Sequence, residues 1–122
     1  MATQTNQLPK NIPICRTRGD DEPIIFTLSS GGSALDVSGM TFILTIDTLE
    51  EPPDNTTNVG SLSSTFVTDG TDGKIMFSPD ATIRDLTANI ERFYDVQRTD
   101  GSGKKKTIIK STWDVAQDIT KV

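Results

Sequence analysis

The sequence predicts an all-β protein: a single antiparallel β-sandwich of immunoglobulin-like type, with about seven strands and an extended N-terminal arm. Three observations lead to this prediction. Apolar residues recur with a period of two rather than 3.6, turns rich in glycine and aspartate separate the apolar runs, and 122 residues can bury one hydrophobic core but not two. We therefore expect one domain over residues 14–122, preceded by an arm over residues 1–13.

The strands are predicted from runs in which apolar and polar residues alternate. The expected buried faces of the two clearest runs consist of Ile24, Phe26 and Leu28, and of Met40, Phe42, Leu44 and Ile46. Further strands are expected over residues 12–17, 62–67, 73–78 and 90–98, and over residues 105–119 as two strands or one bent strand. Tyr94 and Val96 alternate within the run over residues 90–98, so both are expected in the core.

Turns and loops are predicted between these runs. Residues 29–33 and 69–73 tolerate positive φ, and residues 100–103 are typical of a hairpin between two long strands. Residues 50–60 contain prolines and asparagines without any strand or helix pattern, which predicts a long exposed loop. Ser78 is expected to cap one short helical turn with Pro79 as its first residue.

The arm falls outside the strand pattern. It is polar, contains two prolines and has no periodicity, so in isolation it should be disordered. We therefore expect it to become ordered against a neighbouring subunit.

Composition argues against most enzyme classes. The chain has no histidine, so it lacks the usual general base near pH 7 and the usual ligand of transition metals. Its 17 acidic and 12 basic residues give a net charge of −5, which argues against nucleic acid as the main partner. Residues 1–10 are polar and carry no apolar h-region, and no run of 18 apolar residues follows, so neither a signal peptide nor a membrane span is expected. We expect no enzymatic activity, cofactor, metal site, nucleic acid or membrane.

Several single residues and short runs carry open alternatives. Cys15 has no partner for an intrachain disulfide, which favours an intracellular protein in which this cysteine is buried or on an edge strand. The basic run over residues 104–106 is expected to be the solvated end of a hairpin, or else a local contact to an acidic partner. Trp113 is expected in the core or an interface, with an exposed sugar-binding platform as the lesser alternative.

Four short motifs suggest functions that their surroundings do not support. Residues 18–20 read Arg-Gly-Asp, as in adhesion motifs, but Gly19 is better explained by a tight turn. The acidic residues 20–22, and Asp69 with Asp72, lack the spacing of a calcium loop. Residues 101–104 read Gly-Ser-Gly-Lys, but the other positions of a phosphate-binding loop do not match.

Between residues 18 and 120, a series of short motifs follows a characteristic order. They are Gly19-Asp20, Leu35-Asp36-Val37-Ser38-Gly39, Gly73-Lys74-Ile75, Ser78-Pro79-Asp80-Ala81-Thr82, Tyr94-Asp95-Val96-Gln97, Asp114-Val115 and Asp118-Ile119-Thr120. In this order they resemble the immunoglobulin-like N-terminal domain of bacteriophage baseplate upper proteins and related small phage tail proteins. The sequence departs from that pattern at Arg92, where the family often has a glycine, and over residues 110–113.

The resemblance implies a non-enzymatic structural protein of a bacteriophage virion, made in the cytoplasm of the bacterial host. We expect a tail or baseplate adaptor that docks other virion proteins and forms a homo-oligomer within a symmetric assembly. Two alternatives stay open: a capsid decoration (cement) protein that clamps neighbouring capsid subunits, and, less favoured, a carbohydrate-binding module. The expected interface residues are Gln4, Gln7, Leu8 and Ile12 in the arm, Arg18, Asp20, Asp21 and Glu22, and Pro53, Asn55 and Asn58 in the loop.

Overall fold

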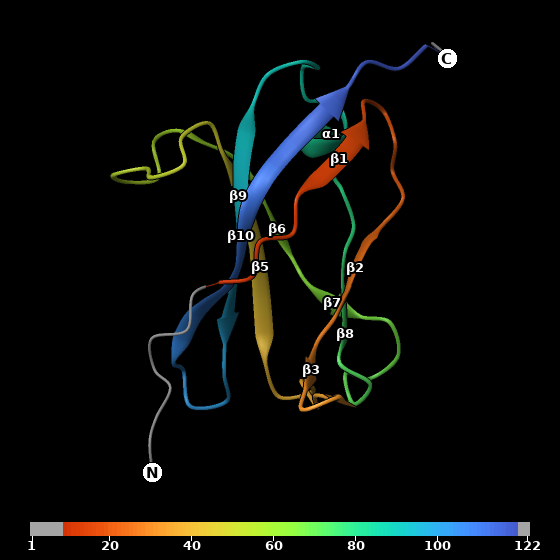
Figure 1. Cartoon of the computed structure of the whole chain (residues 1–122), viewed down its shortest axis with the longest axis vertical. Helices are drawn as coiled ribbons and strands as arrows, with labels where there is room; N and C mark the ends of the chain where they lie inside the picture. The colour runs from red at the N-terminus through yellow and green to blue at the C-terminus, as the bar shows by residue number, and fades with distance from the viewer. Residues whose placement is uncertain (1–8, 120–122) are drawn as a thin grey trace.

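The protein is all-β, as predicted. The computed structural model describes residues 9–119, of which 47% lie in strands and 4% in helix (Figure 1). In chain order the elements are β1 (Ile14–Thr17), β2 (Ile24–Thr27), β3 (Ser29–Ser30), β4 (Ser33–Ala34), β5 (Thr41–Asp47), β6 (Asn58–Ser63), β7 (Thr65–Phe66), β8 (Lys74–Phe77), α1 (Ala81–Arg84), β9 (Arg92–Thr99) and β10 (Lys105–Ala116). Among residues 9–119 there are thus ten strands, three of them only two residues long.

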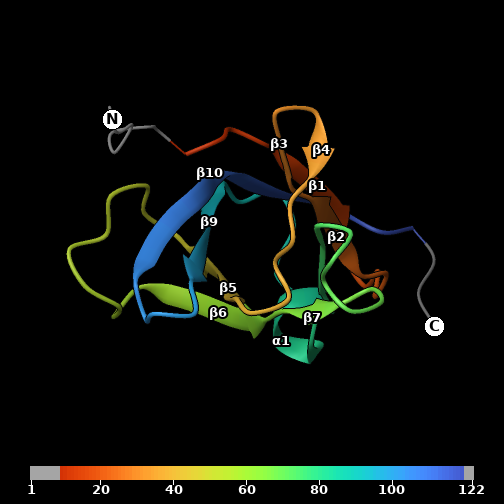
Figure 2. The same ribbon diagram turned by 90° about the horizontal axis from the view of Figure 1, so that it is seen from below.

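Two curled sheets contain all but two of these strands. One has the order β1-β10-β9-β5-β6 and the other the order β2-β8-β7, while β3 and β4 form a separate small hairpin. Figure 2 looks along the strands and shows the larger sheet curling, with β2 and β7 on the opposite side. Within the described residues, β1 pairs with β10 in parallel, and the other strand pairs are antiparallel.

The core lies between the two sheets, on the faces that the alternation predicts. Phe26, Ile75 and Phe77 come from the smaller sheet, and Phe42, Leu44, Ile46, Tyr94, Val96, Ile109, Trp113 and Val115 come from the larger one. Tyr94 and Trp113 pack edge to face, with their ring centroids 5.8 Å apart. Ile25 on β2 and Ile43 on β5 lie on the faces that point away from the core, and they are 49% and 44% exposed.

The predicted strand over residues 62–67 is divided between the two sheets. Its first part belongs to β6 and its last part to β7, so the chain crosses from one sheet to the other at Ser64. Hydrogen bonds to Phe42 hold this crossing: the Ser64 amide donates to the Phe42 carbonyl at 3.0 Å, and the Ser64 hydroxyl accepts from the Phe42 amide at 3.3 Å. Residues 105–116 form one strand, with an irregularity in its pairing between Thr107 and Ile109.

The helical turn is present, but its predicted cap is wrong. Asp80 is the N-cap, because its carboxylate accepts a hydrogen bond from the Ile83 amide at 3.0 Å. Ser78 and Pro79 therefore precede the helix. Aspartate and serine are equally good N-caps, so the sequence alone did not distinguish Ser78 from Asp80 as the residue that caps the helix. The predicted loop over residues 50–60 also ends earlier than expected, because β6 begins at Asn58.

A repeated turn motif connects several strands. In each copy an aspartate carboxylate accepts hydrogen bonds from the amide and the hydroxyl of the serine or threonine two residues later. The four aspartates are Asp36, Asp54, Asp69 and Asp100. These hydrogen bonds favour the ionised carboxylate and hold the pKa of each below the ordinary aspartate value.

Asp100→Ala is expected to lower the melting temperature at pH 7 by a few degrees. The Asp100 carboxylate also accepts from the Lys104 amide at 3.0 Å and so closes the β9–β10 hairpin. Because its pKa is lowered by folding, its stabilisation is complete above the unfolded pKa and is lost as pH falls through the folded value. Thermal melts at pH 7 and pH 3 should therefore show the deficit shrinking in acid, whereas Asp21→Ala, outside the motif, should change little. An equal deficit at both pH values would contradict this.

Candidate functional site

An open groove of about 820 Å³ lies between the two sheets, along β2 and the N-terminal half of β10. The groove exists because, among the described residues, no strand fills the space between β2 and the N-terminal half of β10. Strand β1 pairs with β10 only from Trp113 onward, and β2 is an edge strand that pairs with β8 alone among the described residues. The cleft therefore opens beside an unpaired backbone edge.

The N-terminal segment over residues 9–13 forms part of the groove wall. Lys10 forms a parallel bridge with Ile109: its amide donates to the Ile108 carbonyl at 3.0 Å, and its carbonyl accepts from the Lys110 amide at 2.9 Å. The Ser111 hydroxyl contacts the Asn11 side-chain oxygen. This part of the arm thus lies along the chain's own larger sheet, while residues 1–8 are outside the described part of the chain.

The tyrosine of β9 anchors this segment from inside the core. The Tyr94 hydroxyl donates a hydrogen bond to the Ile12 carbonyl at 2.6 Å, and burial raises the pKa of the phenol, which keeps it protonated as a donor.

Tyr94→Phe is expected to loosen the N-terminal segment without unfolding the domain. The change removes one hydrogen bond, whose net contribution is about 1 kcal/mol. Amide hydrogen exchange should accelerate at Lys10 and Lys110, whose amides bond between the segment and β10. Unchanged exchange at these two amides would show that the tyrosine hydroxyl does not hold the segment.

The groove has an apolar floor that reaches the core. Phe26, Val37 and Ile109 line it and are at most 7% exposed, so the floor is continuous with the packed interior. At its rim, Ile25 and Ile12 are 49% and 36% exposed. A surface of this kind is typical of a protein-binding site, because burying the exposed isoleucines would be favourable.

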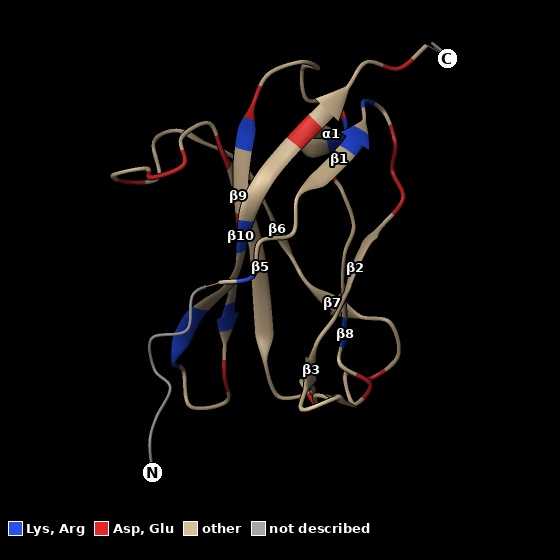
Figure 3. Cartoon of the chain, viewed as in Figure 1, with Lys and Arg blue, Asp and Glu red and all other residues tan. Residues whose placement is uncertain are grey.

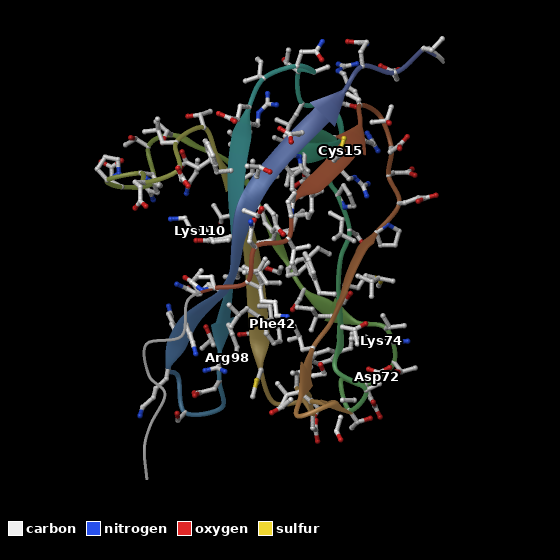
Figure 4. All side chains as sticks on the ribbon, viewed as in Figure 1. Cys15, Phe42, Asp72, Lys74, Arg98 and Lys110 are labelled. Atoms are coloured by element: carbon white, nitrogen blue, oxygen red, sulfur yellow. The ribbon has the colours of Figure 1, made fainter. Side chains whose placement is uncertain are left out.

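Three cations line the same groove: Lys10, Arg98 and Lys106. In the larger sheet, Arg98 on β9 is paired with Phe42 on β5 and with Lys106 on β10. Residues paired across neighbouring strands point to the same face of a sheet. Because Phe42 is in the core, Arg98 also projects inward (Figure 4). Lys106 shares that face as the cross-strand partner of Arg98, at the open end of the space between the sheets. No acidic residue is among those that line the groove.

Among the described residues, Lys10, Arg98 and Lys106 form no salt bridge. The buried Nε of Arg98 has no hydrogen-bond partner in the same part of the chain. Asp100 interacts with Arg98, but one of its carboxylate oxygens already accepts three hydrogen bonds within the hairpin. Figure 3 shows basic residues on the adjoining ends of β9 and β10, whereas acidic residues dominate the long loop and the connection from β1 to β2.

The structure does not bring the sequence-predicted interface residues together. Ile12 lies on the groove, whereas Gln4, Gln7 and Leu8 are outside the described residues. Arg18, Asp20, Asp21 and Glu22 lie in the turn between β1 and β2; Pro53 and Asn55 lie in the loop between β5 and β6, and Asn58 begins β6. In Figures 1 and 2 that turn and that loop occupy opposite sides of the molecule, so they form no common surface.

Two of these segments are held by contacts within the chain. The Arg16 guanidinium donates to the carbonyls of Asp20 and Glu22, and Gly19 has a φ of +92°, which supports the predicted tight turn at residues 18–20. Lys110 of β10 lies 3.5 Å from Glu51 and ties the long loop to the larger sheet. Both segments therefore lie on the surface outside the groove.

The remaining motifs have structural explanations. Cys15 is on the edge strand β1 and is exposed. Trp113 is 1% exposed and so belongs to the core, and residues 100–104 close a hairpin. Within residues 9–119, no group of three or more histidine, cysteine, aspartate and glutamate side chains is placed to hold a metal ion. No helix in the same region is long and apolar enough to cross a membrane.

Sequence reasoning missed the groove cation Arg98, whereas Lys106 belongs to the basic run over residues 104–106, for which a contact to an acidic partner was one of the two expectations. A signal was present, because the alternation that places Tyr94 and Val96 in the core also places Arg98 on the inward face. Comparison with known proteins adds no family assignment: no protein-family model matches the chain, and neither does any curated protein sequence.

Proposed function

We propose that this chain is a non-enzymatic structural protein of a bacteriophage virion, a tail or baseplate adaptor that docks other virion proteins. The observation that carries the proposal is the open groove between the sheets, with its apolar floor and its exposed isoleucines. Such a surface suits a protein segment, and it needs no catalytic residue. The assignment to a bacteriophage virion is supported by the series of short motifs between residues 18 and 120, which resembles that of phage baseplate and tail proteins.

We further propose that the domain is an immunoglobulin-like sandwich. The order β10-β9-β5-β6 corresponds to strands G, F, C and C′ of a variable-type domain, and β2-β8-β7 corresponds to B, E and D. Arg92, where the resembling family often has a glycine, is only 5% exposed and donates to the Thr87 carbonyl at 2.9 Å. The fold thus accommodates this departure.

The test is the protein inventory and copy number of purified phage particles. Mass spectrometry should detect the chain in particles of the phage that encodes it, at about a dozen copies or fewer, as expected for a symmetric tail or baseplate ring. Particles that lack the chain would overturn the proposal. Hundreds of copies would instead support the capsid decoration alternative.

A carbohydrate-binding role has less support. Exposed rings usually form the platform on which a sugar stacks, and the sole tryptophan, Trp113, is buried against Tyr94. The groove, with aliphatic rather than aromatic exposed residues, favours a protein partner.

A further inference from the structure

We propose that the groove binds an acidic, extended segment of a partner protein, which adds as a strand to the free edge of β2. The inference rests on the proposed docking function and names the kind of partner. It combines three features of the groove: an unpaired strand edge, an apolar floor and an excess of positive charge.

The strand edge sets the conformation of the partner. Strand β2 pairs with β8 on one side, and residues 25–30 of the same segment line the groove. Six extended residues span about 20 Å, so a partner strand of similar length could follow this edge. Strand addition supplies backbone hydrogen bonds, while pockets for alternate side chains supply specificity.

The apolar floor of the groove determines which side chains the partner strand should carry on one of its faces. Phe26, Val37 and Ile109 form an apolar surface at the base of the groove, and Ile25 stands exposed at its rim. Alternate residues of an added strand would therefore be aliphatic. This floor also disfavours a nucleic-acid strand, whose charged backbone would have to lie against apolar carbon.

The three groove cations determine which charge the other residues of the partner strand should carry. Lys106 and Arg98 are direct cross-strand partners, and like charges in that position repel each other. With Lys10 they give the lining three positive charges and no negative one, in a chain whose net charge is −5. Partner carboxylates would relieve this repulsion. Residues 1–8 contain no aspartate or glutamate, so the chain's own N-terminus lacks this complement.

The experiment uses the full chain and a labelled nine-residue peptide that alternates valine with glutamate. Fluorescence anisotropy should give a dissociation constant of about 10–100 µM, weakened several-fold between low and high salt. Two matched peptides, with lysine in place of glutamate or with proline in place of the central valine, should bind at least about tenfold more weakly. No saturation below about 1 mM, or equal binding of the lysine peptide, would overturn the proposal.

Two charge-reversal variants on β10 locate the binding. Lys106→Glu should weaken binding about tenfold, because Lys106 lines the groove. Lys105→Glu changes the same charge one position away, where the side chain is exposed and not part of the lining, and should weaken binding less than about twofold. Equal losses in the two variants would show that the attraction is not specific to the groove.

Three further measurements test the strand addition and distinguish the peptide from other occupants of the groove. Hydrogen exchange should show new protection of β2 amides when the peptide binds; protection elsewhere alone would contradict strand addition. Displacement of the peptide by oligothymidylate, or binding only after deletion of residues 1–8, would assign the groove to nucleic acid or to the chain's own N-terminus. The peptide experiments do not depend on whether phage particles contain the chain. The proposed function is tested separately, by the protein inventory of those particles.

Discussion

Gly73→Ala is expected to destabilise the fold by about 3 kcal/mol, from the combined costs of left-handed backbone and overpacking. Gly73 has a φ of +75°, and a Cβ atom there would lie 2.3 Å from the Leu28 carbonyl oxygen and 3.0 Å from that of Leu35. The Leu28 oxygen, which is the closer of the two, cannot move freely. The Leu28 amide donates to the Gly73 carbonyl at 2.8 Å, and the Leu28 carbonyl accepts from the Leu35 amide at 3.0 Å. The glycine therefore allows β2 and β8 to approach.

A matched variant separates the clash from the backbone conformation. Gly32 has a similar φ of +85°, but a Cβ atom there would meet nothing within 4 Å. Gly32→Ala should therefore cost only about 1 kcal/mol. Urea unfolding of both variants measures the difference, and equal losses would show that backbone conformation alone, and not the contact with Leu28, makes glycine necessary.

Trp113→Ala is expected to cost about 3–5 kcal/mol, the usual range when a buried aromatic residue is truncated in a core. The indole is 1% exposed and packs edge to face on Tyr94. Its strand position is also opposite Ile14, where β1 joins the larger sheet. Loss of the ring should therefore weaken both the core and the attachment of β1.

Urea unfolding followed by circular dichroism measures this loss in a variant that has no tryptophan left. Thr112→Ala is the control, because it changes the next residue of β10, on the opposite and partly exposed face. It should cost less than about 1 kcal/mol. In the unmutated chain the fluorescence of the single tryptophan should shift to the red on unfolding. A Trp113→Ala variant as stable as Thr112→Ala would contradict the core assignment.

The sequence was most informative where a strand faces the core on one side only. The period-two pattern correctly placed Phe42, Leu44, Tyr94 and Val96 inside, because each strand here has one buried face. The hairpin at residues 100–103 was equally predictable, since its turn chemistry is local. The same hairpin register brings Arg98 opposite Lys106, so those cations were within reach of sequence reasoning.

The groove itself could not be predicted, because it depends on pairings between distant parts of the chain. Nothing in residues 14–17 indicates that β1 pairs with β10 rather than with β2, and that choice leaves the β2 edge open. The crossing at Ser64 is similar: residues 62–67 alternate as one strand would, and the contact with Phe42 that divides them is 22 positions away in the sequence. Local propensity carries no information about such partners.

The parallel pairing of β1 with β10 has a mechanical consequence. Because the two strands run in the same direction, the chain enters at one end of the pair and leaves at the other (Figure 1). Tension applied between the two ends of the chain therefore acts along the strands. The β1–β10 hydrogen bonds, together with the bond from the Arg18 amide to the Ala116 carbonyl, would be loaded in shear and would share the force instead of opening one after another.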